Sequence, residues 1–468
     1  MQDHIFRKYD IRGIVGNDIV VSEVYNLGRA LACYFFNRAG KSDCTTVAVA
    51  MDGRVHSPAI KDELVRALRE SGLDVCFVGV CPTPVLYFGL HTLACDAGVM
   101  ITASHNEKEY NGFKICYGRE LINADEILKV RDLYKQRAFI PATRTGALTE
   151  ICLVDRYISW LEQAFAHLKG TAVTAVLDCG NGAAAAVVPA LVKRMGWSHV
   201  HVLHETVDGE FPHRSPDPTQ PQALHELSRC VVDLKAACGV AFDGDADRMV
   251  AMTGSGTVLT GDIMLAVFAQ EMVKHKPGLQ VAFDSKCSQV LSTLLKQWGA
   301  RYAVAPTGHA FVKQKMVETH ALLAGELSCH FMFKDRYFGY DDGIYAAMRL
   351  LEIIAATQTS LDHVIAEFPR SYTTGEVRIP CDEHAKLDIV QSVHAAFMGR
   401  SDVEISTLDG VRIETPYGWG IVRASNTQPV MSFSCEAMTP EGFENIKQDF
   451  YKALEPAFQS KSLSRVVF

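Results

Sequence analysis

The chain has 468 residues, a formal net charge of −8 and a hydrophobic fraction of 48%. A chain of this length predicts about three to four domains of roughly 100 to 150 residues each. The negative charge and the lack of a basic run argue against nucleic acid or an anionic membrane surface as the main partner, so any anionic ligand is expected to be held by local groups.

The cysteines and the N-terminus indicate where the protein works. Fourteen cysteines are scattered along the chain without a CxxC pair or a zinc-type spacing, which is typical of buried, reduced thiols. The N-terminal "MQDHIFRKYD" lacks the apolar core of a signal peptide, and no uninterrupted apolar stretch approaches the roughly 18 residues of a membrane helix. We therefore expect a soluble, cytoplasmic protein.

The first polar segment follows this start. In "FRKYDIRGIVG", basic and aromatic side chains stand beside glycines, a combination that suits an anion contact but is weak by itself. These side chains are Arg7, Tyr9 and Arg12.

An apolar, β-rich run that ends at an acidic residue occurs three times, at 47–54, 173–182 and 280–286. Continuous apolar runs of this length are typical of strands in a buried parallel sheet. A helical pattern follows each run; over 57–72, Ser57 is expected to cap the helix and Pro58 to be its first residue. A second strand-like run follows downstream of each helix. The chain is therefore predicted to repeat one α/β unit three times.

Each predicted unit places a polar loop directly after a strand. Since open α/β sheets bind ligands at the carboxyl ends of their strands, the three loops are expected to share one cleft. From residue 367 onward, β runs separated by Gly, Asp-Gly and Pro signals predict a smaller α+β domain with an antiparallel sheet. The predicted domains are 1–150, 151–254, 255–366 and 367–468.

The loop of the first unit contains Ser104, which ends the apolar run "GVMITAS". A serine hydroxyl needs a base or a metal to act as a nucleophile, and no Gly-x-Ser-x-Gly elbow surrounds Ser104, so acyl transfer is disfavoured. Ser104 is either a turn residue or the carrier of a phosphoryl group. Lys114, ten residues on, would supply a cation or a proton-transfer group, and the adjacent His105 is as consistent with structural support as with a functional role.

The loop of the second unit, "FDGDADR", carries Asp243, Asp245 and Asp247. Three carboxylates so close together repel one another unless a cation joins them, although a solvated acidic turn is the alternative. The positions where an EF-hand needs Gly and Glu hold Arg248 and Gly254, so that calcium site is not expected. Magnesium is predicted, since it completes its shell with water and phosphate oxygen, which a phosphorylated Ser104 would supply. Arg248 is expected to orient a neighbouring acid or phosphate.

The loop of the third unit, "GELSCH", carries Glu326, Ser328 and His330 at alternating positions, with Gly325 expected to make the turn. An acid and a hydroxyl that project the same way suit a pair of sugar hydroxyls; a polar hairpin is the alternative. Three further cations of this unit are equally consistent with a surface position: Lys286, His309 and Lys313.

The C-terminal domain contributes "RASNTQP", which follows a strand-like run. A guanidinium, two hydroxyls, an amide and exposed backbone N–H groups together make a phosphate cradle, with a polar turn as the alternative. The side chains are Arg423, Ser425, Asn426 and Thr427.

These four loops, in this order and across almost the whole chain, resemble the α-D-phosphohexomutase superfamily, most closely its phosphomannomutase/phosphoglucomutase branch. "TASHN" is similar to the phosphoserine loop, "DGDADR" to the metal loop, "GELSCH" to the sugar-binding loop and "RASNTQP" to the phosphate-binding loop. The resemblance implies three similar α/β domains with mixed, largely parallel sheets and a C-terminal α+β domain like the TATA-binding protein, all around a central cleft.

Matching positions imply a role for each residue. The implied catalytic residues are Ser104, as the phosphoserine, with Lys114, His309, Arg12 and Arg248. The implied substrate-binding residues are Tyr9, Lys286, Glu326, Ser328, His330, Arg423, Ser425, Asn426 and Thr427. The implied metal ligands are Ser104, Asp243, Asp245 and Asp247.

Three positions depart from the family pattern. Glu107 stands where proline is common, Cys329 where the sugar loop has glycine, and Gln428 where glutamate precedes the last proline. None of them removes a catalytic group, so the departures bear on substrate preference. The Asn426 of "SNT" favours this branch over the phosphoglucosamine mutases, which tend to carry glycine there.

The implied activity is the interconversion of hexose 1-phosphate and hexose 6-phosphate, of mannose or glucose or both, through a phosphoserine enzyme and a hexose 1,6-bisphosphate. The expected cofactor is Mg²⁺, with the bisphosphate as activator and intermediate, and the expected state is a monomer whose partners are small hexose phosphates. Two alternatives stay open: a haloacid-dehalogenase-type phosphatase with Asp243 as nucleophile, and a sugar-phosphate-binding protein without turnover.

Overall fold

The chain folds as two compact units, each made of two segments. The first unit comprises Met1–Thr260 and Ser328–Val364, and the second comprises Gly261–Leu327 and Ile365–Phe468. The computed structural model describes residues 1–39, 45–137, 139–424, 430–460 and 463–464.

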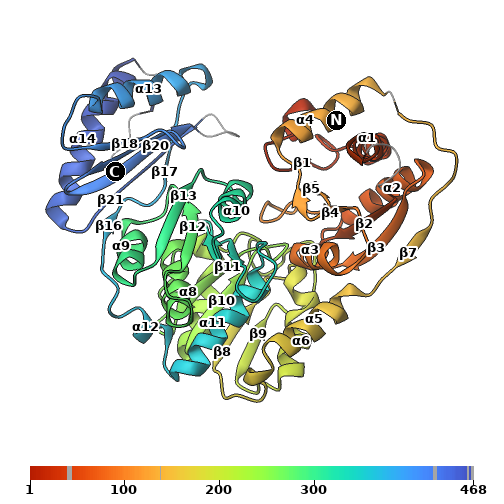
Figure 1. Ribbon diagram of the computed structural model, residues 1–468, viewed down its shortest axis with the longest axis horizontal. Coiled ribbons are helices and arrows are strands. Elements are labelled where there is room, and N and C mark those ends of the chain that lie inside the picture. The colour runs from red at the N-terminus through yellow and green to blue at the C-terminus, as the bar shows by residue number, and fades with distance from the viewer. Residues whose placement is uncertain (40–44, 138, 425–429, 461–462, 465–468) are drawn as a thin grey trace. The chain divides into compact units, whose positions relative to one another are not determined.

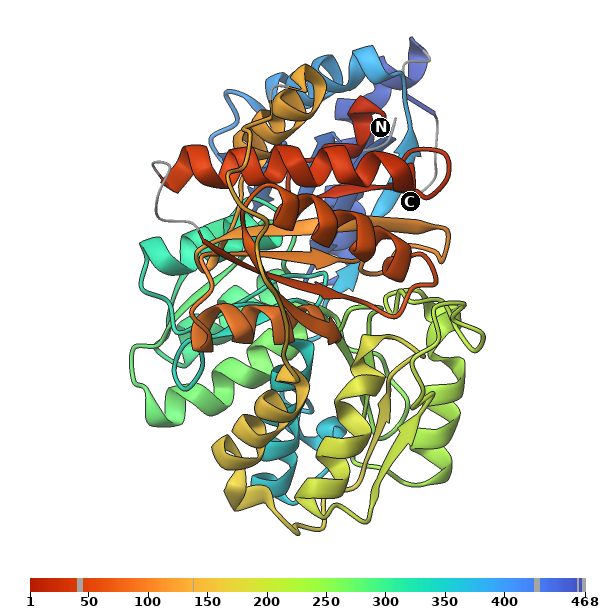
Figure 2. The ribbon, with the colours of Figure 1, turned by 90° about the vertical axis from the view of Figure 1, so that its right-hand side faces the viewer.

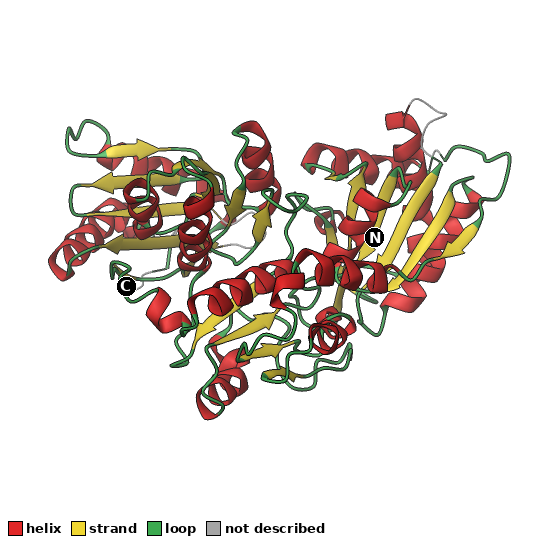
Figure 3. Ribbon diagram, turned by 60° about the horizontal axis from the view of Figure 1, so that its bottom comes forward, coloured by secondary structure: helices red, strands yellow, loops and turns green. Residues whose placement is uncertain are grey.

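The first sheet of the first unit is mixed but largely parallel, as predicted, and Figure 3 shows its strands side by side. Its strands, in spatial order, are β1 (Ile11–Ile14), β5 (Tyr110–Tyr117), β4 (Ala97–Ile101), β2 (Thr46–Met51), β3 (Asp74–Val80) and β7 (Leu148–Glu150), with β6 (Glu120–Leu121) beside β5. The pairs β4–β2, β2–β3 and β3–β7 are parallel, whereas β5 runs antiparallel to both β1 and β4. The carboxyl ends of β2 and β4 therefore meet at one edge of the sheet.

Helices cover both faces of this sheet. One face carries α1 (Val21–Ala39), α2 (Ser57–Glu70) and α4 (Ala124–Gln136), whose apolar residues share one core with alternate strand residues (Figures 1 and 2). The other face carries α3 (Thr83–Thr92), which also contacts α5 (Leu153–Ala164). Coverage of both faces explains why the strand at 46–51 reads as a continuous apolar run.

The predicted start of the helix at 57–72 is wrong by one position. The helix begins at Ser57, His56 occupies the N-cap without a side-chain cap, and Pro58 follows within the first turn. The Ser57 hydroxyl donates instead to Asp52 Oδ1 at 2.9 Å. A buried carboxylate next to the helix start competes for this hydroxyl, and local sequence signals do not show such a partner.

The second sheet of the first unit has three parallel strands and one antiparallel strand at its edge. Its spatial order is β11 (Met249–Thr253), β10 (Cys238–Phe242), β8 (Ala175–Asp178) and β9 (Val200–Leu203). The other elements of this region are α6 (Val188–Met195), α7 (His225–Asp233), β15 (Phe331–Phe333), α11 (Gly343–Thr357) and α12 (Leu361–Val364). Helix α7 contacts β8 and β10, and α11 contacts β10 and β11. Here too, β10, which precedes the acidic loop, lies parallel to β8, the first strand of the second repeat.

The second unit contains a parallel β-sheet with helices and an antiparallel sheet. In the parallel part, β12 (Gln280–Asp284) lies between β13 (Arg301–Ala305) and β14 (Leu323–Gly325), together with α8 (Gly261–His275), α9 (Gln289–Gln297) and α10 (His309–Glu318). The antiparallel sheet consists of β16 (Tyr372–Thr373), β21 (Val430–Ala437), β20 (Gly418–Ala424), β19 (Val411–Thr415) and β18 (Glu404–Ser406), with β17 (Val377–Pro380) also on β21. Helices α13 (Lys386–Phe397) and α14 (Pro440–Gln459) pack together against it (Figure 1). The predicted α+β character of the C-terminal region is confirmed.

Short 3₁₀ helices complete the described structure, at Asp3–Ile5, Ala166–Leu168, Ala183–Ala186, Pro221–Leu224 and Glu383–Ala385. The described cysteines are all free thiols, and most of them are buried. Among the described residues, no helix combines the length and apolarity needed to cross a membrane.

The core of the C-terminal domain allows a test of its stability. Phe450 is fully buried, and its ring lies 5.2 Å from that of Phe397 and 5.3 Å from that of Phe433. Replacing Phe450 by alanine leaves a cavity, so the free energy of unfolding is expected to fall by about 3–5 kcal/mol. Hydrogen exchange of the backbone amides of β20 and β21 at increasing urea concentration measures this change in the free energy of unfolding. Phe443→Ala, at a half-buried position of the same helix, is the control; equal losses for both variants would contradict the prediction.

Candidate active site

Ser104 lies in the loop after β4 and is 2% exposed. Its φ of 51° is in the left-handed region, which is uncommon for a residue with a side chain. The hydroxyl donates to Asp243 Oδ2 at 2.9 Å and lies 3.1 Å from His105 Nδ1. The backbone conformation thus directs the serine hydroxyl at the acidic loop, 139 residues further along the chain.

The acidic loop follows β10 and buries Asp243, Asp245 and Asp247 almost completely. Each offers a carboxylate oxygen within 4.8 Å of the others. Asp245 Oδ1 and Asp247 Oδ1 are buried without a hydrogen-bond partner. Because buried carboxylate oxygens without a partner are costly, and hard divalent cations prefer such oxygens, these residues fit a metal such as Mg²⁺.

The charges of this cluster are strongly coupled. Burial, reinforced by Asp247 and Asp245, raises the pKa of Asp243 well above its usual value. Burial also acts to raise the pKa of Asp247, but the ammonium of Lys114 opposes it most strongly, and the pKa of Asp247 lies well below its usual value. Without a metal, Asp243 is therefore the carboxyl of this pair that takes up a proton, while Asp247 stays ionised.

Lys114 and Arg248 are the cations next to the acidic loop. Lys114, on β5, is buried; its ammonium donates to Asp245 Oδ2 at 2.7 Å and contacts Asp247. Although burial acts to lower the pKa of Lys114, Asp245 and Asp247 raise it above its usual value, so this lysine stays protonated. The Arg248 backbone N–H donates to Asp243 Oδ1 at 3.2 Å.

His330 joins the same cluster through Arg248. The Arg248 Nε–H donates to His330 Nε2 at 3.1 Å, so this ring nitrogen is the acceptor. The other ring nitrogen lies 3.2 Å from Ser328 Oγ, and His330 Nε2 lies 3.4 Å from Asp247 Oδ1. Arg248, Ser328 and His330 therefore form one polar chain beside the metal loop.

The N-terminal residues also reach the serine loop. Arg12, on β1, is 9% exposed, pairs with Asp10 and donates to Asn106 Oδ1 at 2.6 Å. Burial lowers the pKa of His105 well below its usual value, and Arg248 and Arg12 reinforce this effect, so His105 is neutral between two cations. Tyr9 is half-buried in the segment before β1.

The predicted sugar loop differs from its expected shape. Gly325 is the last residue of β14 and not the turn; the left-handed position is Cys329, with a φ of 69°. Glu326 is buried, and its Oε1 accepts the backbone N–H of Gly308 at 2.8 Å. This bond places Glu326 next to His309, the first residue of α10.

The remaining predicted residues lie in the second unit. Lys286 is mostly buried and 3.8 Å from Glu376, and Lys313 is half-buried on α10. Arg423, on β20, lies 3.2 Å from Asp409, which also accepts the backbone N–H of Thr307 at 3.1 Å. Ser425, Asn426, Thr427 and Gln428 lie outside the described residues.

The structure thus brings together, in the first unit, Ser104, Lys114, Asp243, Asp245, Asp247, Arg248, Ser328 and His330. Thr83 also belongs to this cluster and was not predicted from the sequence; its hydroxyl and its backbone N–H both donate to Asp245. Its signal was present, since "TP" follows the strand-like run "DVCFVGV" and so stands at the carboxyl end of a strand of the same sheet.

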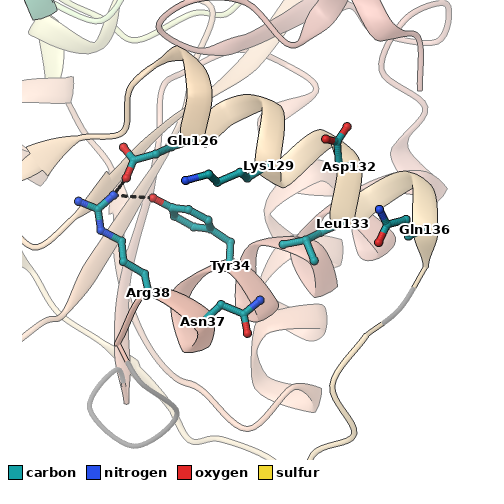
Figure 4. A pocket seen from close by; sticks show the side chains of 8 residues that line it. All are labelled: Tyr34, Asn37, Arg38, Glu126, Lys129, Asp132, Leu133 and Gln136. Carbon is teal, nitrogen blue, oxygen red and sulfur yellow. Dashed lines mark hydrogen bonds and ion pairs between the residues drawn. The ribbon is translucent and has the colours of Figure 1, made fainter.

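A separate pocket of about 370 Å³ lies between α1 and α4 (Figure 4). Arg38 at its edge contacts Glu126 and donates to the Tyr34 hydroxyl at 2.7 Å. None of the predicted site residues lines this pocket, so it is distinct from the serine and metal loops.

Comparisons with known proteins cover the whole chain. The models for the phosphoglucomutase/phosphomannomutase family match in order: α/β/α domain I over 3–140, domain II over 155–256, domain III over 260–372 and the C-terminal domain over 376–453.

Relatives and solved structures agree with these matches. A phosphomannomutase/phosphoglucomutase of Pseudomonas aeruginosa is 40% identical over 96% of this chain and 95% of its own. A phosphoglucomutase of Neisseria gonorrhoeae is 36% identical over 96% of each chain. The crystal structure of a phosphoglucomutase/phosphomannomutase family protein from Burkholderia thailandensis covers 98% of each chain with a TM-score of 0.89 and 33% identity.

Fold and relatives together define a phosphohexomutase, an intramolecular phosphotransferase. The chain belongs to the phosphoglucomutase/phosphomannomutase family. The resemblance drawn from its four loops is confirmed, and the comparisons do not support the phosphatase or the binding-protein alternative.

Proposed function

We propose that this phosphohexomutase interconverts the 1- and 6-phosphates of mannose and glucose through phospho-Ser104 and a hexose 1,6-bisphosphate. The observation that carries the proposal is the hydrogen bond from the Ser104 hydroxyl to Asp243, within a buried carboxylate cluster that has unpartnered oxygens. This geometry leaves a serine-bound phosphate next to a cation site.

We assign the Mg²⁺ ligands to Asp243, Asp245, Asp247 and an oxygen of phosphorylated Ser104. Bound there, Mg²⁺ would neutralise the charge that develops on the transferring phosphoryl group. Lys114, whose ammonium donates to Asp245 and contacts Asp247, adds a second positive charge to this cluster.

In the first half-reaction, the bond between Ser104 Oγ and phosphorus breaks while the 6-hydroxyl of a hexose 1-phosphate forms a new bond to phosphorus. Lys114, held protonated by its two carboxylates, would donate a proton to the departing serine oxygen. The imidazole of His309 would accept the proton of the attacking hydroxyl, while Arg12 and Arg248 orient the phosphoryl oxygens.

In the second half-reaction, the bisphosphate reorients, Lys114 takes back the proton of the Ser104 hydroxyl, and Ser104 Oγ forms a bond to the other phosphorus. The bond between that phosphorus and the sugar 1-oxygen breaks, His309 returns its proton to this oxygen, and hexose 6-phosphate leaves. We assign contacts with the sugar hydroxyls to Glu326 and Ser328. The phosphate that does not react would be held by Arg423, Ser425, Asn426 and Thr427, and Tyr9, Lys286 and His330 are proposed as further contacts of the substrate. A cradle of this kind accepts the phosphate from either end of the sugar, because it contacts only phosphate oxygens.

The four domains that serve this reaction remain proposed as 1–150, 151–254, 255–366 and 367–468. A monomeric state and a cytoplasmic location are likewise proposed, on the basis of sequence composition and the reduced cysteines. Size-exclusion chromatography with light scattering tests the monomer, for which a mass near 51.5 kDa is expected.

Phosphorus NMR tests the reaction itself. Purified protein, Mg²⁺ and a trace of the matching 1,6-bisphosphate are supplied with mannose 1-phosphate or, separately, glucose 1-phosphate. We expect the 6-phosphate signal to grow with both sugars and only when Mg²⁺ is present, and the ratio of the two rates gives the sugar preference. Release of inorganic phosphate, or unchanged spectra with both sugars, would contradict the proposal.

A further inference from the structure

Three aspartates that the proposed reaction does not use stand at the carboxyl end of the first strand of each α/β repeat: Asp52 directly follows β2, whereas Asp178 and Asp284 are the last residues of β8 and β12. All three are at most 2% exposed. In each repeat, the strand next to the aspartate pairs in parallel with the strand that leads to a functional loop: β2 with β4, β8 with β10, and β12 with β14. The functional loops are the serine loop (102–107), the metal loop (243–248) and the sugar loop (326–329). Each buried acid is therefore next to the start of one functional loop.

Asp52 is bonded to the serine loop through two side chains. Its Oδ2 accepts the Thr102 hydroxyl at 2.8 Å, and the Thr102 oxygen in turn accepts the backbone N–H of Ser104 at 2.9 Å. The same carboxylate accepts Arg54 Nε at 3.0 Å. Asp52 thus fixes Thr102 and Arg54, and both of these contact the backbone of the loop.

Arg54 is fully buried, and its guanidinium donates to backbone carbonyl oxygens of the serine loop. Its terminal nitrogens reach Ser104 at 2.8 Å, Asn106 at 2.6 Å, Glu107 at 2.6 Å and Tyr110 at 3.1 Å. Both backbone groups of Ser104 are therefore held from the end of β2, and this hold accounts for the persistence of its left-handed conformation.

Asp178 holds the metal loop in a corresponding way. Its Oδ2 accepts Arg214 Nε at 2.6 Å, and Arg214 donates to the carbonyl oxygen of Phe242 at 2.8 Å, directly before Asp243. Its Oδ1 accepts the backbone N–H of Gly180 at 2.8 Å and lies 2.8 Å from His204 Nδ1. A second buried Asp–Arg pair thus contacts the backbone at the start of a functional loop.

Asp284 reaches the sugar loop without an arginine. Its Oδ1 accepts the backbone N–H of Leu327 at 3.0 Å, the residue after Glu326. Its Oδ2 lies 3.4 Å from the Thr307 hydroxyl, so it also contacts the loop that leads to His309. Asp284 therefore contacts its functional loop directly, whereas Asp52 and Asp178 contact theirs through an arginine.

We propose that Asp52, Asp178 and Asp284 are positioning residues, each of which fixes the backbone of the functional loop on the neighbouring strand. The inference rests on the proposed function for the role of each loop. Its physical basis is that a carboxylate accepts several hydrogen bonds at once, and a loop fixed in its reactive geometry does not need to be ordered during the reaction. Because the three loops have different roles, replacing each of the three aspartates by asparagine is expected to cause a different loss of function.

The test compares Asp52→Asn, Asp178→Asn and Asp284→Asn. Asp52→Asn is expected to lower kcat by about tenfold to a hundredfold at nearly unchanged KM, because the phosphoryl donor is misplaced. Asp178→Asn is expected to weaken binding of Mn²⁺, measured by electron paramagnetic resonance of the free ion, by about tenfold or more. Asp284→Asn is expected mainly to raise KM.

Asp96→Asn is the matched control. Asp96 accepts the backbone N–H groups of Thr45 and Thr46, at the opposite end of β2 from Asp52. It too fixes backbone, but far from the functional loops, so kcat, KM and Mn²⁺ binding are expected to stay as in the wild type.

Hydrogen exchange of the functional loops separates this inference from the proposed function, since it does not depend on turnover. Each Asn variant is expected to speed exchange in its own loop only, at 102–107, 243–248 or 326–329. If the wild type shows no mutase activity but the exchange pattern holds, the proposed function fails and the positioning stands. Exchange that is unchanged, or raised equally in all three loops, would overturn the positioning.

Should an Asn variant not fold, Arg54→Lys and Arg214→Lys keep the charge but lose most of the carbonyl contacts, and the same local exchange is expected.

Discussion

Replacement of Ser104 by alanine is expected to lower mutase activity by about a thousandfold or more, a loss typical of removing the group that carries a covalent intermediate. The hydroxyl is the group that would bear the phosphoryl group, and it donates to Asp243 Oδ2 at 2.9 Å. The measurements are kcat for glucose 1-phosphate and the intact mass after incubation with glucose 1,6-bisphosphate, where the wild type gains one phosphoryl group and the variant gains none.

Ser71→Ala is the matched control for this variant. Ser71 is also a buried serine of the first domain, and its hydroxyl donates to the carbonyl oxygen of Ala67 at 2.7 Å. The kcat of this control, and its gain of one phosphoryl group, are expected to equal those of the wild type. Full turnover by Ser104→Ala, or a phosphoryl group mapped to Asp243, would refute the phosphoserine mechanism.

The second large effect is expected from Asp243→Asn, which replaces one of three buried carboxylates by a neutral group of the same shape. The Mg²⁺ concentration for half-maximal activity is expected to rise at least about tenfold, because a charged ligand is lost. Mg²⁺ is expected to raise the melting temperature of the wild type by binding the folded state, and this shift is expected to disappear in the variant.

The same variant should not be less stable than the wild type when both are free of metal. Burial and the neighbouring acids raise the pKa of Asp243 above its unfolded value, so its favourable contribution is present at low pH and is lost as the pH rises through the folded pKa. An asparagine avoids this loss at neutral pH. Asp62→Asn, at an exposed position of α2, is the control. A metal-free Asp243→Asn protein that melts well below the wild type at pH 7 would contradict the argument.

The sequence determined the local part of this site. Three aspartates at alternating positions in "DGDADR" are close together in any conformation of the loop, so their mutual repulsion and their fitness for a cation are readable without a fold. The apolar runs before each loop predicted buried parallel strands, and the loop order indicated the family. The predictions that Ser57 caps its helix and that Gly325 makes a turn are wrong, because the Ser57 hydroxyl donates to Asp52 and Gly325 pairs with Phe283 of β12.

Only the tertiary structure decided how these loops meet. Ser104 and Asp243 are 139 residues apart, and Lys114 and Asp245 are 131 apart. These contacts require two sheets of the first unit to bring the ends of β4 and β10 together with β5. Arg54 and Arg214 also depend on tertiary structure, because their buried guanidinium groups donate to the carbonyl oxygens of Ser104 and Phe242, which are distant from them in the sequence. Spacing along the chain shows which groups can act, whereas strand pairing and packing decide which atoms come within hydrogen-bonding distance, because those forces act between segments that are distant in sequence.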